Sequence, residues 1–168
     1  MNAVSLIAGN GLSLLGMVLE SISATRKTAK SMLLIQSVSQ FIYCISTIFF
    51  KGYSAAVQNG VNVLRNLAVL RNIESRFVEW FLIALGVILG ILWNNLGLVG
   101  YLPIVANLQY TLAVFRFKED ERSLKKSFFL SLIMFAVFNI FIFNIVGVVS
   151  NLIILTTTGI SLFRPAEK

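Results

Sequence analysis

Seven long apolar runs, separated by short polar or charged breaks, dominate this chain of 168 residues. A helix needs about 20 mainly apolar residues to cross the hydrocarbon layer of a membrane. Seven such helices would take about 140 residues, which leaves no room for a folded domain outside the membrane. The chain is therefore predicted to be an all-α integral membrane protein, with its function inside the helical bundle.

The composition agrees with lipid as the main solvent. Hydrophobic residues make up 57% of the chain and charged residues only 12%, whereas about a quarter of the residues of a soluble domain are charged. The breaks at Lys51-Gly52 and at Asn144 to Gly147 are only turns, so each joins an antiparallel pair. The predicted helices are Val4 to Ile22, Ser31 to Phe50, Tyr53 to Leu70, Phe77 to Trp93, Val99 to Phe115, Phe128 to Val146 and Val148 to Phe163.

The basic residues give an orientation, because cytoplasmic loops retain Lys and Arg. Apart from Lys51 and Arg65, the basic residues, 12 of the 14, fall in alternate loops or in the C-terminal tail. They are Arg26, Lys27, Lys30, Arg71, Arg76, Arg116, Lys118, Arg122, Lys125, Lys126, Arg164 and Lys168. We therefore predict a multi-pass protein with its N-terminus outside and its C-terminus in the cytoplasm.

A weak internal repeat divides the predicted helices into three, one and three. Gly9-Asn10, Lys30-Ser31, Gln58-Asn59 and Arg71 in the first half correspond to Ala106-Asn107, Lys126-Ser127, Ser150-Asn151 and Arg164 in the second. Two three-helix units joined by one helix point the same way, which makes a parallel repeat. We expect repeats at residues 1–74 and 98–168, with a linker helix at 75–97. Transporters built from repeats bind their cargo between the halves, near the midplane.

The linker helix has no strongly polar residue between Trp80 and Trp93. Gly86 and Gly90 have the spacing of a close helix contact in membranes. They are expected either to pack against the bundle or to form an interface with a second copy of the chain.

The third predicted helix carries a polar stripe. Its polar side chains recur at steps of three or four residues, which places them on one face of a helix that cannot contact lipid. They are Gln58, Asn59, Asn62, Arg65 and Asn66.

Asparagines from five predicted helices fall at similar depths, about 5 to 12 Å from the outer boundary at 1.5 Å per residue. They are Asn10, Asn59, Asn107, Asn139 and Asn151. Their amides supply both donors and acceptors, so they can replace the water around a polar solute. The alternative is that they only hold helices together. Gln36 and Gln40 share one face of the second helix and are expected to complete the lining.

Arg65 is the basic residue that lies within a predicted span. An ionisable residue at such a depth is a functional hypothesis by default. Its guanidinium could extend to the cytoplasmic interface, pair with Glu20 on the first helix, or bind an anionic group of a cargo molecule.

Several function classes are disfavoured. The chain has no histidine and one cysteine, Cys44, and its acidic residues lie almost entirely in loops. These features argue against an enzyme, a metal site and a disulfide, and no cofactor is indicated. The net charge of +7 is dispersed over short loops, as membrane topology requires, so nucleic acid is not an expected partner.

The third helix also carries a family resemblance. Ser54-Ala55-Ala56, followed by Asn62, Arg65 and Arg71, resembles the bacterial inner membrane protein family called YgjV. Further motifs that support it are Leu102-Pro103-Ile104-Val105, Phe138-Asn139, and Asn151 with Arg164. The resemblance implies an inner membrane location and no firmly established activity.

The implied architecture is similar to that of the SWEET sugar transporters and the PnuC vitamin transporters. In SWEET proteins, asparagines on the third and seventh helices contact cargo, which points here to Asn59 or Asn62, and to Asn151. The chain differs from these transporters in having only Pro103 within a span and no Pro-Gln motif.

The sequence therefore favours a facilitator of a small polar solute, such as a sugar or vitamin-like molecule, with membrane lipids around it. The alternatives are a scaffold or regulatory subunit that transports nothing and, with less support, a lipid-handling protein.

Overall fold

The structure, a computed structural model, describes residues 3–73, 75–117 and 119–163. Within these ranges the chain forms seven α-helices and one short 3₁₀ helix, with no strand. The helices are α1 (Ala3–Ala24), α2 (Ala29–Phe49), α3 (Tyr53–Leu70), α4 (Arg76–Leu92), η1 (Gly97–Gly100), α5 (Tyr101–Arg116), α6 (Glu121–Phe141) and α7 (Ile145–Phe163).

The apolar runs locate all seven helices, and the predicted bounds of α3 are confirmed. The largest error is in α6, which begins seven residues before the predicted Phe128. Asp120 caps the new start by accepting hydrogen bonds from the backbone N–H groups of Arg122 (3.0 Å) and Ser123 (3.1 Å). Contacts of Lys125 also stabilise the charged first turns of α6. Lys125 contacts Glu121 on the same helix and Ser161 on α7.

The turn between α6 and α7 also lies earlier than predicted. Asn144 is not inside a four-residue break but immediately precedes α7, and its side chain accepts a hydrogen bond from the N–H of Gly147 at 2.9 Å. Because an asparagine at this position satisfies a free N–H of the first turn, the helix begins at Ile145 rather than at Val148.

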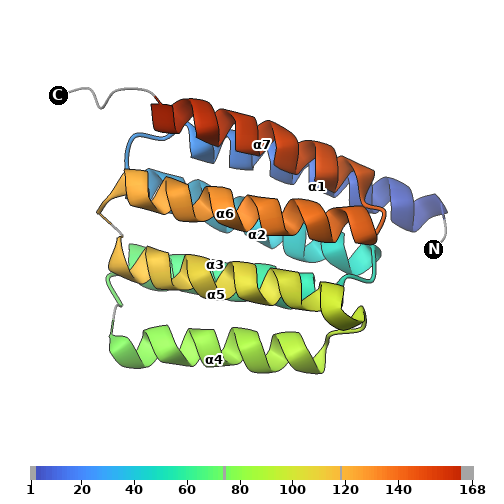
Figure 1. Cartoon of the computed structure of the whole chain (residues 1–168), viewed down its shortest axis with the longest axis horizontal. Helices are drawn as coiled ribbons and strands as arrows, with labels where there is room; N and C mark the ends of the chain where they lie inside the picture. The colour runs from blue at the N-terminus through green and yellow to red at the C-terminus, as the bar shows by residue number, and fades with distance from the viewer. Residues whose placement is uncertain (1–2, 74, 118, 164–168) are drawn as a thin grey trace.

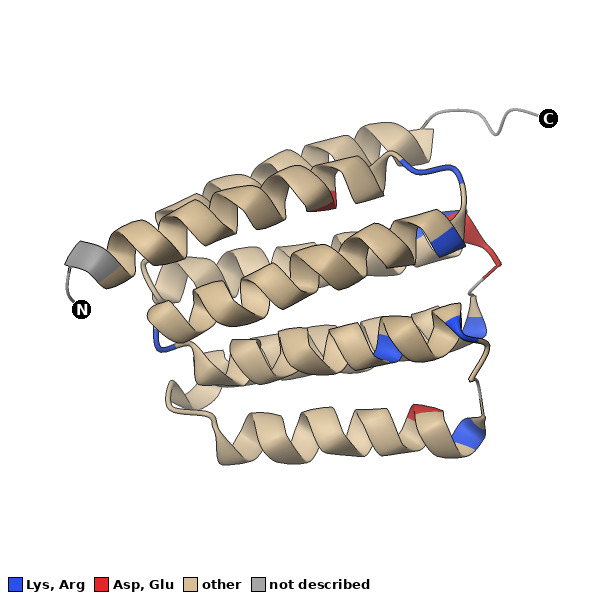
Figure 2. Cartoon of the chain, turned by 180° about the vertical axis from the view of Figure 1, so that it is seen from behind, with Lys and Arg blue, Asp and Glu red and all other residues tan. Residues whose placement is uncertain are grey.

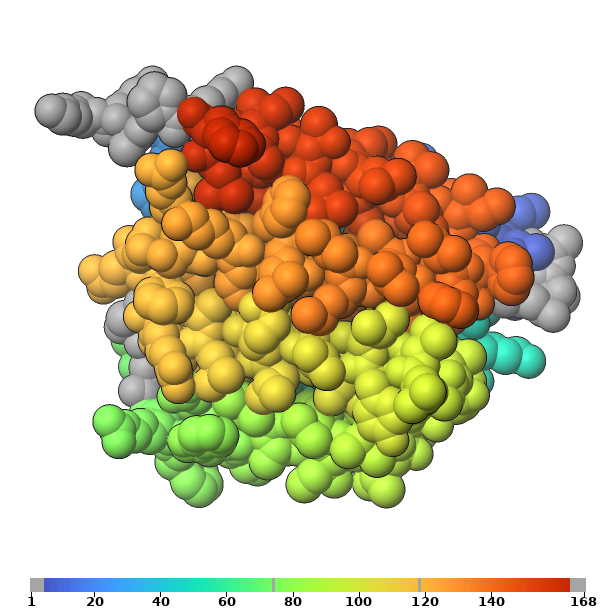
Figure 3. Space-filling view, viewed as in Figure 1, coloured from blue at the N-terminus to red at the C-terminus, as the bar shows by residue number. Residues whose placement is uncertain are grey.

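Six helices form a closed ring in which each packs on the next, in the order α1, α2, α3, α5, α6 and α7, and α7 returns to α1. In Figure 1, α7, α6 and α5 lie in front of α1, α2 and α3. Helix α4 stands outside the ring, against α3 and α5. Figure 3 shows the outer face that α4, α5, α6 and α7 build together. Helix α4 therefore does not border the interior of the ring.

Five helical segments are long and apolar enough to span a membrane. They are Ser5–Ala24, Ala29–Phe49, Gly97–Arg116, Glu121–Phe141 and Ile145–Phe163. The two remaining helices are α3, whose polar stripe makes it less apolar, and α4, which has 17 residues. Both lie parallel or antiparallel to the other helices and have similar extents in Figure 1.

The outer surface suits a lipid environment. Large apolar side chains are exposed on every side, for example Leu15 (58%), Phe41 (59%), Phe81 (53%) and Leu152 (55%). Such a surface would not be stable in water. In Figure 2 most Lys and Arg residues lie at one end of the bundle, where α1, α3 and α5 end and α2, α4 and α6 begin. Lys118, Arg164 and Lys168 of the predicted basic clusters lie outside the described residues.

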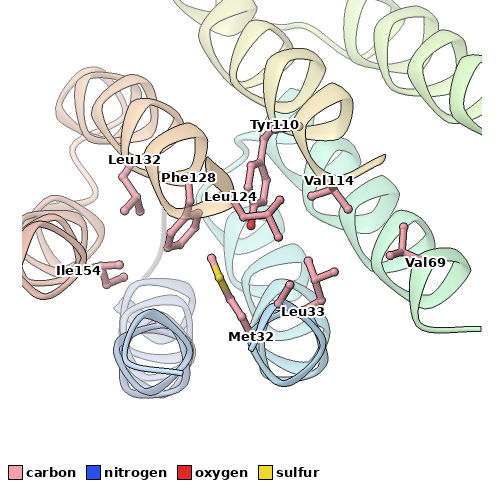
Figure 4. Close-up of a cluster of buried hydrophobic side chains, with 11 residues drawn as sticks. Met32, Leu33, Val69, Tyr110, Val114, Leu124, Phe128, Leu132 and Ile154 are labelled. Carbon is pink, nitrogen blue, oxygen red and sulfur yellow. The ribbon is translucent and has the colours of Figure 1, made fainter. Parts of the chain in front are cut away.

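An apolar cluster fills the interior of the ring toward this charged end. It joins the first turns of α2 and α6 to the last turns of α3 and α5, with Ile154 from α7. Figure 4 shows Met32, Tyr110, Phe128 and Leu132 converging between the helices. The residues of the cluster are Ala29, Met32, Leu33, Val69, Tyr110, Ala113, Val114, Leu124, Phe128, Leu132 and Ile154.

The hairpins α2–α3 and α6–α7 have matching geometry. Thr28 and Asp120 are the N-caps of α2 and α6, and both helices have 21 residues. Lys51 (φ 57°) and Phe143 (φ 56°) both adopt the left-handed conformation in the turns that follow. Each pair differs by 92 in residue number (120 less 28, 143 less 51). The same offset places Ser31 opposite Ser123, four positions before the Ser127 of the predicted pairing, and the repeat itself stays a prediction.

Candidate binding cavity

A cavity lies inside the ring, between the α1–α3 half and the α5–α7 half. Its volume is about 60 Å³, which is enough for roughly four to six waters. Its polar lining residues are Glu20, Gln40, Tyr43, Thr47, Asn59, Asn62, Asn107, Tyr110, Ser131, Asn139, Asn144 and Asn151. Its apolar wall includes Phe128, Leu132, Phe135, Phe138 and Ile154.

Six of the eight predicted site residues line this cavity. They are Gln40, Asn59, Asn62, Asn107, Asn139 and Asn151. The structure therefore brings together side chains from α2, α3, α5, α6 and α7. The polar stripe of α3 faces the interior, since each of its five side chains is at most 4% exposed.

Asn10 does not line the cavity. Its neighbour Gly9 is the residue that faces α2, where its carbonyl accepts a hydrogen bond from Ser46 (2.8 Å) and a Cβ would lie 2.9 Å from the ring of Phe50. The pairing of Asn10 with Asn107 in the predicted repeat thus has no counterpart at the cavity wall, where α1 contributes only Glu20.

Arg65 also lies off the cavity wall, fully buried behind it. Its guanidinium donates to Asn62 (2.8 Å), Asn107 (3.3 Å) and Thr111 (3.3 Å). Its Nε and Nη2 both donate to Asn66, at 2.9 and 2.8 Å, and its Cζ lies 4.6 Å from the ring centre of Tyr110. Of the three alternatives for Arg65, the structure does not have the one in which the side chain extends to the cytoplasmic interface, because these partners hold it inside the bundle.

Arg65 and Glu20 are connected through two amides rather than by direct contact. Asn62 accepts from Arg65 and donates to Gln40 at 3.1 Å, and Gln40 donates to Glu20 at 2.9 Å. Ser39 donates to the same oxygen of Glu20, Oε1, at 2.8 Å. This chain of hydrogen bonds orders the side chains on the α1, α2 and α3 side of the cavity.

A second branch of the network reaches the outlying helix α4. Asn107 donates to Gln58 at 2.5 Å, and Gln58 donates to the carbonyl of Gly86 at 2.8 Å. A Cβ at Gly86 would lie 3.1 Å from both side chains, and one at Gly90 only 2.4 Å from Nε2 of Gln58. The two glycines therefore face α3 and α5 within the chain, and an interface with a second copy through α4 stays a prediction.

Three buried polar atoms at the cavity have no hydrogen-bond partner in the described part of the chain. They are Oε2 of Glu20, the hydroxyl of Tyr43 and Nδ2 of Asn151. A buried polar group without a partner costs about 1 to 3 kcal/mol. A hydrogen-bond partner for these atoms would remove this cost.

The cavity also contains residues that were not among the predicted site residues. Tyr43, Thr47 and Tyr110 sit on apolar helices, where nothing in the sequence distinguishes them from core residues, and Asn144 was assigned to a turn. Glu20 was expected as a partner of Arg65 and was not among the predicted site residues. The lining positions do show a regular spacing, because 40, 43, 47, 55, 59 and 62 recur 92 residues later as 132, 135, 139, 147, 151 and 154.

The chemistry of the cavity suits a polar organic molecule. Its lining offers amide donors and acceptors, hydroxyl groups and one carboxylate beside phenyl rings, which is the usual composition of a small-molecule site. Among the described residues, no group of three or more His, Cys, Asp or Glu side chains gathers where it could hold a metal ion.

Comparison with known proteins agrees with the resemblance seen on α3. The model of the YgjV family, described as a bacterial inner membrane protein, matches residues 7–168. No curated protein and no solved structure matches the chain, so a relation to the SWEET or PnuC transporters receives no support from these comparisons. With a match over nearly its whole length, the chain belongs to the YgjV family of bacterial inner membrane proteins.

Proposed function

We propose that the protein transports a small polar solute across the inner membrane, by facilitated diffusion through the cavity between its two halves. The observation that carries the proposal is the cavity itself, a partly enclosed space lined by amide, hydroxyl and carboxyl side chains beside apolar ones, with unpartnered donors and acceptors among its lining residues, inside a bundle whose outer surface is apolar. Polar groups at membrane depth are tolerated where they line such a cavity, and they mark solute pathways.

The proposed architecture is seven crossings arranged as two parallel three-helix repeats, with α4 as the linker helix. Exchanging α1 with α5, α2 with α6 and α3 with α7 leaves the order of contacts around the ring unchanged. The matching hairpins and the matching lining positions support the same relation. Bundles related in this way can move against each other around a fixed site.

The proposed orientation places the charged end in the cytoplasm and the N-terminus outside, in keeping with the excess of Lys and Arg there. The apolar cluster of Figure 4 then closes the cytoplasmic side of the cavity. The structure would correspond to a state in which solute reaches the cavity only from the opposite end. Release to the cytoplasm requires the first turns of α2 and α6 to separate from the last turns of α3 and α5.

Uptake into proteoliposomes tests the proposal. Purified protein is reconstituted, and the flux of radiolabelled sugars, vitamins and nucleosides is measured. Asn59→Leu and Asn151→Leu, which remove lining amides from α3 and α7, are expected to abolish the flux. Asn10→Leu is the matched control, since it removes an amide outside the cavity and should leave the flux unchanged.

Two results would count against transport. One is the absence of flux for every solute while circular dichroism shows folded protein. The other is loss of flux in all three variants alike, which would indicate a general loss of structure. A stoichiometric protein partner isolated from native membranes, together with no flux, would favour the scaffold alternative.

A further inference from the structure

Glu20 uses one carboxylate oxygen in hydrogen bonds within the protein and leaves the other without a partner. Oε1 accepts hydrogen bonds from both Ser39 (2.8 Å) and Gln40 (2.9 Å), whereas Oε2 is buried without a partner. The side chain is 2% exposed and lines the cavity. A carboxylate held in this way lacks the donor that would balance its second oxygen.

Tyr43 lies at the same seam between α1 and α2. Its ring packs on Gly16, one helical turn before Glu20, where a Cβ would lie 2.8 Å from Cε1 and Cζ. Its hydroxyl is also unpartnered, and Tyr43 is a lining residue of the cavity. The hydroxyl oxygen can accept a hydrogen bond, so this corner of the cavity offers two acceptors from two helices.

The guanidinium of Arg65 does not neutralise this corner by direct contact. Its hydrogen bonds go to Asn62, Asn66, Asn107 and Thr111, and it does not line the cavity. A molecule that enters the cavity therefore meets the carboxylate and not the guanidinium. This arrangement disfavours an anionic group at this position.

The α7 wall of the cavity presents the complementary group. Asn151 is 8% exposed, and its Nδ2, a donor, is buried without a partner. Phenyl rings from α6, namely Phe128, Phe135 and Phe138, line the space as well.

We infer that the cavity recognises a small solute with a protonated amine at one end, a hydrogen-bond acceptor at the other and an apolar or planar body between them. The amine would donate to Oε2 of Glu20 and to the Tyr43 hydroxyl, and the acceptor would take the free N–H of Asn151. Hydrogen bonds to a charged group are stronger than those between neutral groups. The inference rests on the proposed function only in taking this cavity as the place where the solute binds.

Three compounds of one shape test the charge preference. They are 4-(aminomethyl)pyridine, isonicotinamide and isonicotinate, which carry a cationic, a neutral and an anionic group opposite the same ring nitrogen at neutral pH. Binding to the purified full-length protein is measured by isothermal titration calorimetry. The cation is expected to bind about tenfold or more tightly than the amide, as one charged hydrogen bond implies, and the carboxylate most weakly.

Glu20→Gln keeps the shape and the Oε1 acceptor but removes the charge. We expect it to reduce the preference for the cation over the amide to about one, given that the charged hydrogen bond is its source. Glu79→Gln on α4, which does not line the cavity, should leave the preference unchanged. Asn151→Leu should weaken binding of all three compounds, because they share the ring nitrogen.

The order of affinities for the wild-type protein tests the inferred preference for the cation even where a variant does not fold. Equal affinities, a preference for the amide or the carboxylate, or no binding of the cation overturns the inference, as does a preference that survives Glu20→Gln. Failure of the transport proposal is distinguishable. If the cation binds in a Glu20-dependent way but no flux is seen, only the transport proposal is rejected. If neutral or anionic solutes are transported independently of Glu20, only the preference for an amine is rejected.

Discussion

Replacing Arg65 with methionine removes the donor from two buried oxygens. Oδ1 of Asn62 accepts from Arg65, and Oδ1 of Asn66 accepts two of its N–H groups. Leaving a buried acceptor unsatisfied costs about 1 to 3 kcal/mol, so the two together cost about 2 to 6 kcal/mol. The variant also removes the cost of burying the charge of Arg65, which offsets part of this loss. A single variant therefore does not measure the interaction.

A double-mutant cycle with Asn66→Leu removes this ambiguity. Asn66→Leu alone leaves Nε and Nη2 of Arg65 without an acceptor, whereas the double variant removes both sides of the paired contact. The loss in the double variant should be smaller than the sum of the single losses by about 1 to 3 kcal/mol. Arg65→Lys should rescue little, since an ammonium lacks the fork that contacts Asn66 twice.

Unfolding of the detergent-solubilised protein by sodium dodecyl sulfate, followed by far-ultraviolet circular dichroism, gives the four free energies. A cycle of Arg65→Met with Thr156→Val is the control, because Thr156 is exposed and bonds only the carbonyl of Leu152. The control should be additive within about 0.5 kcal/mol. Additivity of the Arg65 and Asn66 losses within the same margin would refute the role assigned to this network.

Three further outcomes are expected. Gly90→Ala should destabilise the protein by about 1 to 3 kcal/mol, because the added Cβ clashes with Gln58. Gly11→Ala should not, because its Cβ would have no neighbouring atom within 4 Å. Equal losses of stability for the two variants in the same unfolding assay would contradict this prediction. Hydrogen bonds from Ser123 lower the pKa of Asp120. The ionised side chain therefore stabilises the fold at a pH above the pKa of the unfolded state, and this stabilisation is lost as the pH falls through the lower pKa of the folded state. The stability advantage of wild type over Asp120→Asn, itself a competent cap, should shrink below about pH 4, and a constant difference across an acid titration would argue against this. In a Cys44→Ser background, an impermeant maleimide should label Lys51→Cys but not Arg26→Cys in cells with a permeabilised outer membrane, and the reverse pattern would invert the orientation.

Periodicity and hydropathy were enough to find the helices and the inward-facing stripe on α3. Both follow from local physics, because lipid selects apolar runs and excludes a polar face. Where α6 begins could not be predicted in this way. Its first turns are charged, and the cap at Asp120 and the contact of Lys125 with Ser161 decide the boundary.

The partners across helices could not be predicted from local patterns. Arg65 meets Asn107 and Thr111, which are more than 40 positions away in the chain, only because α3 packs on α5 around the ring. That Asn10 does not line the cavity could not be predicted for the same kind of reason, since the rotation of α1 depends on the packing of Gly9 against α2. Which direction Gly86 and Gly90 face is likewise a property of the assembled bundle.

The polar stripe of α3 has a consequence for biosynthesis. A segment that places an arginine and several amides in hydrocarbon partitions poorly by itself, because translocon-mediated insertion penalises such residues by about 2.5 to 3.5 kcal/mol for each central charge. Helix α2 is apolar enough to insert, and only a tight turn through Lys51 separates it from α3. We expect the pair to enter the bilayer as one hairpin, with α2 leading and shielding its partner until α5 arrives. The order of synthesis would then determine when the polar side chains of α3 that line the cavity are first transferred from water into the bilayer.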